Sequence, residues 1–140
     1  MSSPSDTMII TLKGDLNEIA DLVNSIQVAA ERFNLSAEIA SQLSLVLEEL
    51  YCNSVNYGLL HTVKPEVIIQ LTLSKAVLRI IYRDNGMAFN PLDIKMPDVS
   101  LGIDERPLGG LGIFFVKSFT DSAEYSYDSG FNQINLIKQL

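Results

Sequence analysis

The stretch VIIQLTLSKAVLRIIYRD, residues 67–84, decides the fold of this chain. It contains two runs of β-branched and aliphatic residues, Val67 to Leu73 and Val77 to Asp84, with a short turn region at Ser74 and Lys75 between them. Two such runs separated by so few residues predict an antiparallel β-hairpin. The sequence therefore predicts paired strands in the middle of the chain.

Further helices and strands are predicted on both sides of this hairpin. Apolar residues recur at steps of three and four in two segments, which predicts amphipathic helices over 16–33 and, after an N-cap at Ser36, over 37–58. The other expected elements are a strand over 8–13, a short helix over 113–119 and a terminal hairpin over 123–127 and 131–139. Because the strands cluster instead of alternating strictly with helices, we expect an α+β two-layer sandwich, with a mixed, mostly antiparallel sheet and helices on one face.

The size and composition fit one globular domain. The chain has 140 residues, of which 47% are hydrophobic and 19% are charged, so it can bury a core without disulfides or a structural metal. We expect a single domain over 1–140, with a disordered tail over 1–7. The sequence shows neither a basic signal region nor an apolar run long enough to span a bilayer, which favours a cytoplasmic protein.

Charge and residue counts argue against several classes of function. Ten Lys and Arg against seventeen Asp and Glu give a net charge of −7, and an anionic surface repels nucleic acids and acidic lipid headgroups. We therefore expect neither a nucleic-acid nor a membrane partner. The single cysteine, Cys52, cannot form an intrachain disulfide, and the single histidine, His61, cannot supply a zinc cluster.

Glu49, Asn53 and Asn56 form the first cluster that could carry chemistry. Their spacing of i, i+4 and i+7 places them in one narrow stripe on the second predicted helix. A partly desolvated carboxylate can act as a general base, and an amide oxygen one turn away can bind a hard cation such as Mg²⁺. The alternative is an ordinary solvated helix face, which is the more common outcome for these residue types taken alone.

The second cluster, Asp84-Asn-Gly-Met-Ala-Phe-Asn-Pro91, directly follows the apolar strand. Asp-Asn-Gly is common turn chemistry, but Pro91 cannot donate to a central ladder and no alternating strand follows. A long segment without regular structure inside a compact domain is usually functional. Asp84 at the strand end can accept a hydrogen bond from a ligand's exocyclic amine, and Gly86 lets a ligand approach the backbone closely.

The third cluster is Gly109-Gly110-Leu111-Gly112, at the start of the predicted helix over 113–119. Exposed backbone N–H groups at a helix N-terminus can bind phosphates, whereas the alternative is a flexible hinge. No Gly-Lys-Ser/Thr follows, so this is not a Walker A loop, and Phe115 stands at the last glycine position of a dinucleotide fingerprint. The cluster alone indicates an anion site and leaves the ligand open.

Taken together and in this order, the three clusters resemble the N, G1 and G2 boxes of the GHKL ATPases. The matching segments are Glu49-Leu-Tyr-Cys-Asn53, Asp84 to Pro91, and Glu105-Arg-Pro-Leu-Gly-Gly-Leu-Gly112. The likeness covers Met8 to Leu140 and is strongest to the stand-alone anti-sigma factor serine/threonine kinases of the RsbW and SpoIIAB type. It implies a Bergerat fold that binds ATP and Mg²⁺.

The resemblance also implies a role for the matching residues. Glu49 would be the general base, Asn53 the Mg²⁺ ligand and Asp84 the acceptor of the adenine amine, with Gly86 making room for the adenine. Gly110 to Gly112 would cradle the phosphates beneath an ATP lid over 90–108. The other expected nucleotide-binding residues are Asn56, Phe89, Gly109 and Leu111. Tyr57 departs from the family pattern, because many relatives have a histidine there.

The activity of the family sets the expected function. Such kinases phosphorylate a serine on a STAS-type anti-anti-sigma protein and otherwise sequester a sigma factor, so nucleotide state and phosphorylation change which partner binds. The resemblance also suggests a homodimer. Two alternatives stay open. One is a nucleotide-gated module that sequesters a partner without catalysis, and the other is the catalytic domain of a split histidine kinase, whose phosphoacceptor would lie on a partner chain.

Overall fold

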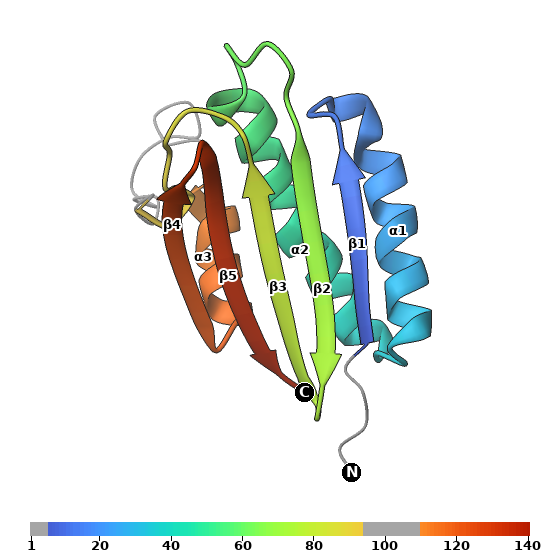
Figure 1. Cartoon of the computed structure of the whole chain (residues 1–140). Coiled ribbons are helices and arrows are strands. Elements are labelled where there is room, and N and C mark those ends of the chain that lie inside the picture. The colour runs from blue at the N-terminus through green and yellow to red at the C-terminus, as the bar shows by residue number, and fades with distance from the viewer. Residues whose placement is uncertain (1–5, 94–109) are drawn as a thin grey trace.

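A five-stranded antiparallel sheet forms one layer of the molecule, and helices form the other. The computed structural model describes residues 6–93 and 110–140, and its strands are β1 (Asp6–Leu12), β2 (Val67–Ser74), β3 (Val77–Asp84), β4 (Ser122–Asp128) and β5 (Phe131–Gln139). They lie in the order β1-β2-β3-β5-β4 (Figure 1). Every strand pair in these ranges is antiparallel. The prediction of a mostly antiparallel sheet is therefore confirmed, and the described strands include no parallel pair.

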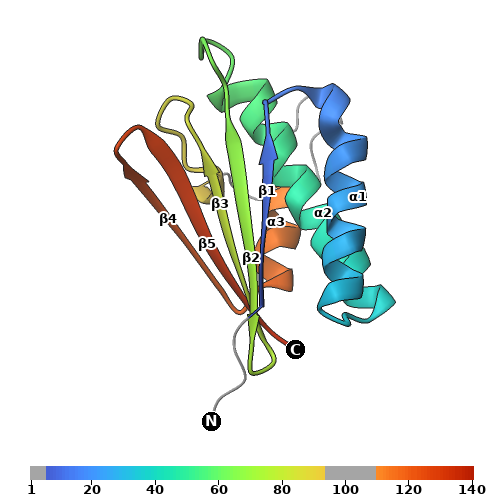
Figure 2. The ribbon, with the colours of Figure 1, turned by 45° about the vertical axis from the view of Figure 1, so that its right-hand side comes forward.

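The helices α1 (Ile19–Arg32), α2 (Ala37–Asn53) and α3 (Gly110–Phe119) cover a single face of this sheet (Figure 2). A 3₁₀ turn over Leu16–Glu18 leads into α1, and a π-helical turn over Ser54–Gly58 continues α2. The prediction of an α+β two-layer sandwich is therefore confirmed. None of the helices in the described part of the chain is long and apolar enough to cross a membrane.

Both predicted hairpins form, each through a two-residue turn with a left-handed backbone. Lys75 and Ala76 have φ values of 51° and 62°, and Ser129 and Gly130 have φ values of 55° and 83°. Positive φ at both central residues is the type I′ pattern, whose twist matches that of antiparallel strands. The β2–β3 turn thereby fixes the register of the strand that ends at Asp84.

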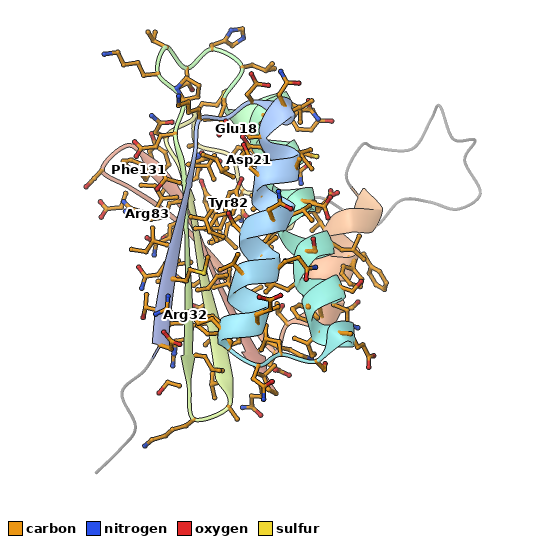
Figure 3. The ribbon with its side chains drawn as sticks, turned by 90° about the vertical axis from the view of Figure 1, so that its right-hand side faces the viewer. Glu18, Asp21, Arg32, Tyr82, Arg83 and Phe131 are labelled. Carbon is orange, nitrogen blue, oxygen red and sulfur yellow. The ribbon has the colours of Figure 1, made fainter. Side chains whose placement is uncertain are left out.

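Alternation along β3 decides which of its side chains face the helices. Tyr82 points into the space between sheet and helices, whereas Arg83 lies with Phe131 on the open face of the sheet (Figure 3). The Arg83 guanidinium is 4.4 Å from the centroid of the Phe131 ring, a cation–π contact. Asp84 therefore faces inward like Tyr82, and it is only 7% exposed.

Tyr51 anchors α2, the helix that carries Glu49, to the segment before α1. Its hydroxyl donates to Asp15 O at 2.9 Å and accepts from Asp15 N at 2.8 Å, while its ring is buried in the core. Burial raises the pKa of Tyr51 to about 12, so the hydroxyl stays protonated. At the other end of α2, Ser36 caps the helix as predicted, with Ile39 N donating to Ser36 Oγ at 3.1 Å.

Some predicted boundaries are wrong. The helix predicted over 113–119 already begins at Gly110. The strand β1 begins at Asp6, and both Asp6 and Thr7 pair with β2, so a disordered tail cannot extend to residue 7. The α-helix predicted to reach residue 58 ends at Asn53 and continues as the π-helical turn, in which Leu59 N donates to Ser54 O at 2.8 Å. This wider turn changes the directions of the side chains after Asn53 relative to α-helical spacing.

Candidate functional site

Three segments meet at one end of the two layers: the C-terminal end of α2, the turn that follows β3 and the first turn of α3 (Figure 1). A Cβ placed on Gly112 of α3 would overlap the Glu49 carboxylate. A Cβ placed on Gly86, after β3, would overlap the backbone of Gly58 at the end of the π-helical turn. The three clusters singled out from the sequence therefore adjoin in space.

Glu49 lies where α2 faces α3. Its carboxylate is half-buried against Gly112 and accepts a hydrogen bond from Asn53 Nδ2 at 3.4 Å. Burial raises the pKa of the Glu49 carboxyl above its ordinary value, and the bond from Asn53 offsets part of that rise. Glu49 is therefore a stronger base than a surface carboxylate, which is the property that a general base needs.

Asn53 is buried one helical turn after Glu49, with 4% of its surface exposed. Because its amide nitrogen points to Glu49, its amide oxygen is the atom suited to a hard cation. The structure thus joins Glu49 and Asn53 as their spacing predicts. Asn56 instead lies exposed in the π-helical turn, outside α-helical spacing, and its role at the site stays a prediction.

Asp84, at the end of β3, is held by three donors. Ser54 Oγ donates to Asp84 Oδ2 at 2.7 Å, while Gly86 N and Asn132 Nδ2 donate to Oδ1 at 3.0 and 2.9 Å. Ser54 Oγ is also 2.7 Å from the Tyr82 hydroxyl. Each carboxylate oxygen can accept two bonds, so among the described residues Oδ2 keeps one acceptor position for a ligand donor.

Sequence reasoning misses Ser54 and Asn132. Asn132 is 4% exposed on the inner face of β5, and its bond to Asp84 joins residues 48 positions apart. A sequence signal for it exists, because Asn132 is a polar residue in the alternation that Ile134 and Leu136 continue. Ser54 offers only the weaker signal of following Asn53 directly.

Gly86 packs against protein backbone, so its lack of a side chain has a structural reason, while its role in making room for the adenine stays a prediction. Its Cβ would overlap the Gly58 carbonyl, and Met87 N donates to Gly58 O at 3.0 Å. The turn after β3 is thus pressed onto the end of the π-helical turn. Phe89 continues this contact, since its ring centroid lies 6.0 Å from that of Tyr57.

The predicted phosphate site falls on the first turn of α3. Gly110 opens this helix and Gly112 follows within the same turn, which places backbone N–H groups beside Glu49. Gly109 lies outside the described residues, and for Leu111 the structure describes the backbone alone. Backbone N–H groups in this position are suited to bind an anion close to the Glu49 carboxylate, the candidate base.

Most of the predicted lid over 90–108 also lies outside the described residues. Its first residues form a short 3₁₀ turn, Pro91–Asp93. Asn90 starts this turn, because its Oδ1 accepts a hydrogen bond from Leu92 N at 2.9 Å. The structure therefore describes only the first residues of the predicted lid.

The sequence matches a family model over most of its length. Residues 12–138 match the histidine kinase-like ATPase domain. The chain belongs to this family. Because the matched region contains the clusters at Glu49, Asp84 and Gly110, the likeness to the GHKL ATPases is confirmed. Membership of an ATPase family implies that the nucleotide is ATP.

Two similar members of the family are named as protein kinases. The chain is 23% identical over 136 residues to the serine/threonine-protein kinase BtrW of Bordetella bronchiseptica, which covers 97% of this chain and 94% of that protein. It is 26% identical over 110 residues to the serine-protein kinase RsbW of Listeria monocytogenes, which covers 76% of this chain and 70% of that protein. The expected likeness to the RsbW type is confirmed.

Two solved structures share the fold. The RsbU and RsbW domains of Rv1364c from Mycobacterium tuberculosis match 99% of this chain with a TM-score of 0.70 and 14% identity, and this chain spans 33% of that chain. A histidine kinase domain from Erythrobacter litoralis matches 87% of this chain and 60% of its own, with a TM-score of 0.54 and 14% identity. These similarities support the architecture around the site.

The residues of the site fit ATP and a hard cation. Asp84 Oδ2 offers an acceptor to an exocyclic amine, and the amide oxygen of Asn53 is a ligand that Mg²⁺ accepts. At Gly112 a Cβ would overlap the Glu49 carboxylate, so glycine is what lets the first turn of α3 approach this base. The donor set therefore suits a magnesium–nucleotide complex.

Proposed function

We propose that this chain is an ATP-dependent protein serine kinase that phosphorylates a STAS-type anti-anti-sigma protein and otherwise sequesters a sigma factor. One observation carries the proposal: the Glu49 carboxylate, whose pKa burial raises, touches the first turn of α3 at Gly112. A base in that position adjoins the N–H groups that would hold the phosphates. A module that only sequesters a partner has no need of such a base.

Glu49 would act on the hydroxyl of the substrate serine. As a carboxylate it can accept the hydroxyl proton while the serine oxygen bonds to the γ-phosphorus of ATP and the bond from that phosphorus to ADP breaks. A raised pKa makes the proton transfer to Glu49 more favourable. The amide oxygen of Asn53 would hold Mg²⁺, which when bound neutralises charge on the phosphates. The backbone N–H groups from Gly110 to Gly112 would orient the same phosphates.

Asp84 would select the nucleotide. Its Oδ2 can accept from the adenine N6 amine, while Ser54 and the turn at Gly86 keep the carboxylate in place. Guanine presents a carbonyl oxygen at the corresponding position, which would face the carboxylate. Two unpaired acceptors in a desolvated pocket cost roughly 1 to 3 kcal/mol, so the site should prefer ATP to GTP.

The likeness to RsbW-type kinases supports the remaining parts of the proposal. We place the protein in the cytoplasm as a homodimer, with partner choice set by nucleotide state and by phosphorylation of the STAS protein. The net charge of −7 is consistent with protein partners and disfavours nucleic acid.

Incubation with Mg-ATP and the STAS protein encoded nearest to this chain tests the kinase assignment. Mass spectrometry should then detect phosphoserine on the STAS protein. If no STAS protein tested is phosphorylated while ATP still binds, the chain is instead the sequestering module. A phosphohistidine on a partner chain would support the split histidine kinase.

Calorimetric titration tests the nucleotide assignment. The wild-type protein should bind Mg-ATP more tightly than Mg-GTP, and Asp84→Asn should lose this preference because an amide can present a donor to the amine. Asp128→Asn is the matched control, since Asp128 is an exposed aspartate at the end of β4. Equal affinities of the wild type for ATP and GTP would contradict the role of Asp84.

A further inference from the structure

Asn132, near the start of β5, uses every hydrogen-bonding position of its side chain inside the protein. Its Nδ2 donates to Asp84 Oδ1 at 2.9 Å and to Met87 O at 2.8 Å. Its Oδ1 accepts from Phe89 N at 2.9 Å and from the Tyr125 hydroxyl at 2.5 Å. A neutral amide has two donor hydrogens and two acceptor positions, so this side chain is saturated.

Saturation fixes both the orientation and the role of Asn132. Turning the amide over would set its oxygen against the Asp84 carboxylate and the Met87 carbonyl, so its neighbours determine which way it points. Nδ2 also lies 3.5 Å from Gly86 O, a longer contact that shares one of the same hydrogens. Because each position already has a partner, Asn132 can influence a ligand only through the groups that it holds.

Those groups are the two ends of the turn after β3. Asp84 begins the turn and Phe89 lies near its other end, and one amide plane binds both. Gly86 N closes the turn from within by donating to Asp84 Oδ1 at 3.0 Å. The position of the Asp84 carboxylate is therefore set jointly by Ser54 at Oδ2 and by the turn and Asn132 at Oδ1.

Tyr125, on the neighbouring strand β4, supports Asn132 in turn. Alternation places Tyr125 on the inner face of the sheet, and its hydroxyl reaches Asn132 Oδ1. Burial raises the pKa of the Tyr125 hydroxyl, which keeps it protonated and able to donate. The chain of contacts thus runs from β4 through β5 to the end of β3.

We propose that Asn132 is a positioning residue that sets the preference of this site for adenine over guanine, with Tyr125 as its support. The inference rests on the proposed nucleotide site. It goes further by assigning discrimination to a side chain that has no group free for the nucleotide. Asp84 can reject a carbonyl oxygen only while its own oxygens are held in place, and Asn132 supplies that restraint.

Asn132→Asp is the sharpest perturbation, because it keeps the size of the side chain and removes both donors. It also sets a carboxylate against Asp84. We expect the affinity for Mg-ATP to fall at least about tenfold, with a comparable fall in the ratio of ATP to GTP affinity. The new carboxylate still offers an acceptor to Phe89 N, but it is no longer tied to Asp84 and Met87, so the amide of Phe89 should exchange its hydrogen faster.

Tyr125→Phe is the milder perturbation. If Asn132→Asp does not fold, the same measurements on Tyr125→Phe still test the proposal. This substitution removes one hydrogen bond, so the same quantities should shift in the same direction by a smaller factor. The matched control is Asn135→Asp, on the opposite face of β5. It should keep the wild-type affinities and the wild-type exchange of Phe89.

Calorimetry with Mg-ATP and Mg-GTP, together with hydrogen exchange at Phe89, decides the matter. A purely structural role would lower the unfolding midpoint and leave the ratio of ATP to GTP affinity at the wild-type value, which overturns the proposal. Wild-type exchange at Phe89 in both variants overturns it as well. If the wild type itself does not prefer ATP, the proposed nucleotide assignment fails and the specificity role falls with it. Exchange at Phe89 in Asn132→Asp then reports separately whether Asn132 holds the turn.

Discussion

Replacing Gly86 with alanine tests whether the turn after β3 is pressed onto the end of the π-helical turn. In Gly86→Ala the new Cβ would overlap the Gly58 carbonyl and lie 3.2 Å from Leu59 N. These are backbone atoms, which cannot swing aside as the end of a side chain can. The turn must therefore move away from Gly58, and this breaks the 3.0 Å hydrogen bond from Met87 N to Gly58 O.

Three contributions set the size of the effect on the free energy of unfolding. Overpacking of this kind costs about 1 to 3 kcal/mol, and loss of the hydrogen bond from Met87 adds about 0.5 to 1.5 kcal/mol. Alanine also restricts the unfolded chain, which offsets about 0.4 to 1 kcal/mol. The central expectation is a loss of about 2 kcal/mol. The affinity for ATP should fall too, because Gly86 N anchors Asp84.

Urea denaturation followed by circular dichroism measures this loss. Gly58→Ala is the matched control, because its Cβ would meet only Asp84 Oδ2, at 3.8 Å, which is an ordinary contact. We expect Gly58→Ala to stay within about 0.5 kcal/mol of the wild type. If Gly86→Ala is as stable as Gly58→Ala, the close approach of the two segments is refuted.

Three further predictions concern the catalytic side of the site. Glu49→Gln should raise the free energy of unfolding near neutral pH, because burial raises the folded-state pKa of Glu49 and disfavours its charged form. This gain in the free energy of unfolding should vanish below the ordinary pKa of a glutamate, where the carboxyl is protonated in both the folded and the unfolded state. Urea titrations of both proteins at about pH 7 and about pH 4 measure the gain, and a difference in stability that does not depend on pH would contradict the prediction. Asn53→Ala should weaken binding of Mg-ATP more than binding of metal-free ATP in calorimetry, and an equal loss would argue against a metal ligand. Amides over 90–108 should exchange more slowly with Mg-ATP than without it, and unchanged exchange would rule out a lid.

The hairpins and the pairing of Glu49 with Asn53 can be predicted from sequence because they depend on local properties. Alternation and turn length within Val67 to Asp84 suffice to pair β2 with β3. In the same way, α-helical spacing suffices to bring Glu49 and Asn53 together. The change to π-helical geometry after Asn53, which moves Asn56 out of α-helical spacing, escapes this reasoning, because a π-helical turn depends on an i+5 hydrogen bond that hydrophobic periodicity does not reveal.

The features of the site that the sequence does not predict depend on contacts between distant segments. The close approach of Gly86 to the backbone of Gly58 cannot be predicted from the sequence. Asn132 looks like an ordinary strand residue, because sequence does not show that β5 lies beside β3 and so brings Asn132 to Asp84. Both residues matter through tertiary neighbours, and periodicity carries no information about those neighbours.

The proposed function depends on Glu49 acting as the general base of a serine kinase. The most direct test is the rate of phosphoserine formation on a STAS partner at saturating Mg-ATP, compared between the wild type and Glu49→Gln. We predict that transfer by Glu49→Gln is slower by about 100-fold or more, while its affinity for ATP is unchanged, because glutamine keeps the size of the side chain and loses its basicity. Transfer at the wild-type rate by Glu49→Gln would exclude Glu49 as the general base.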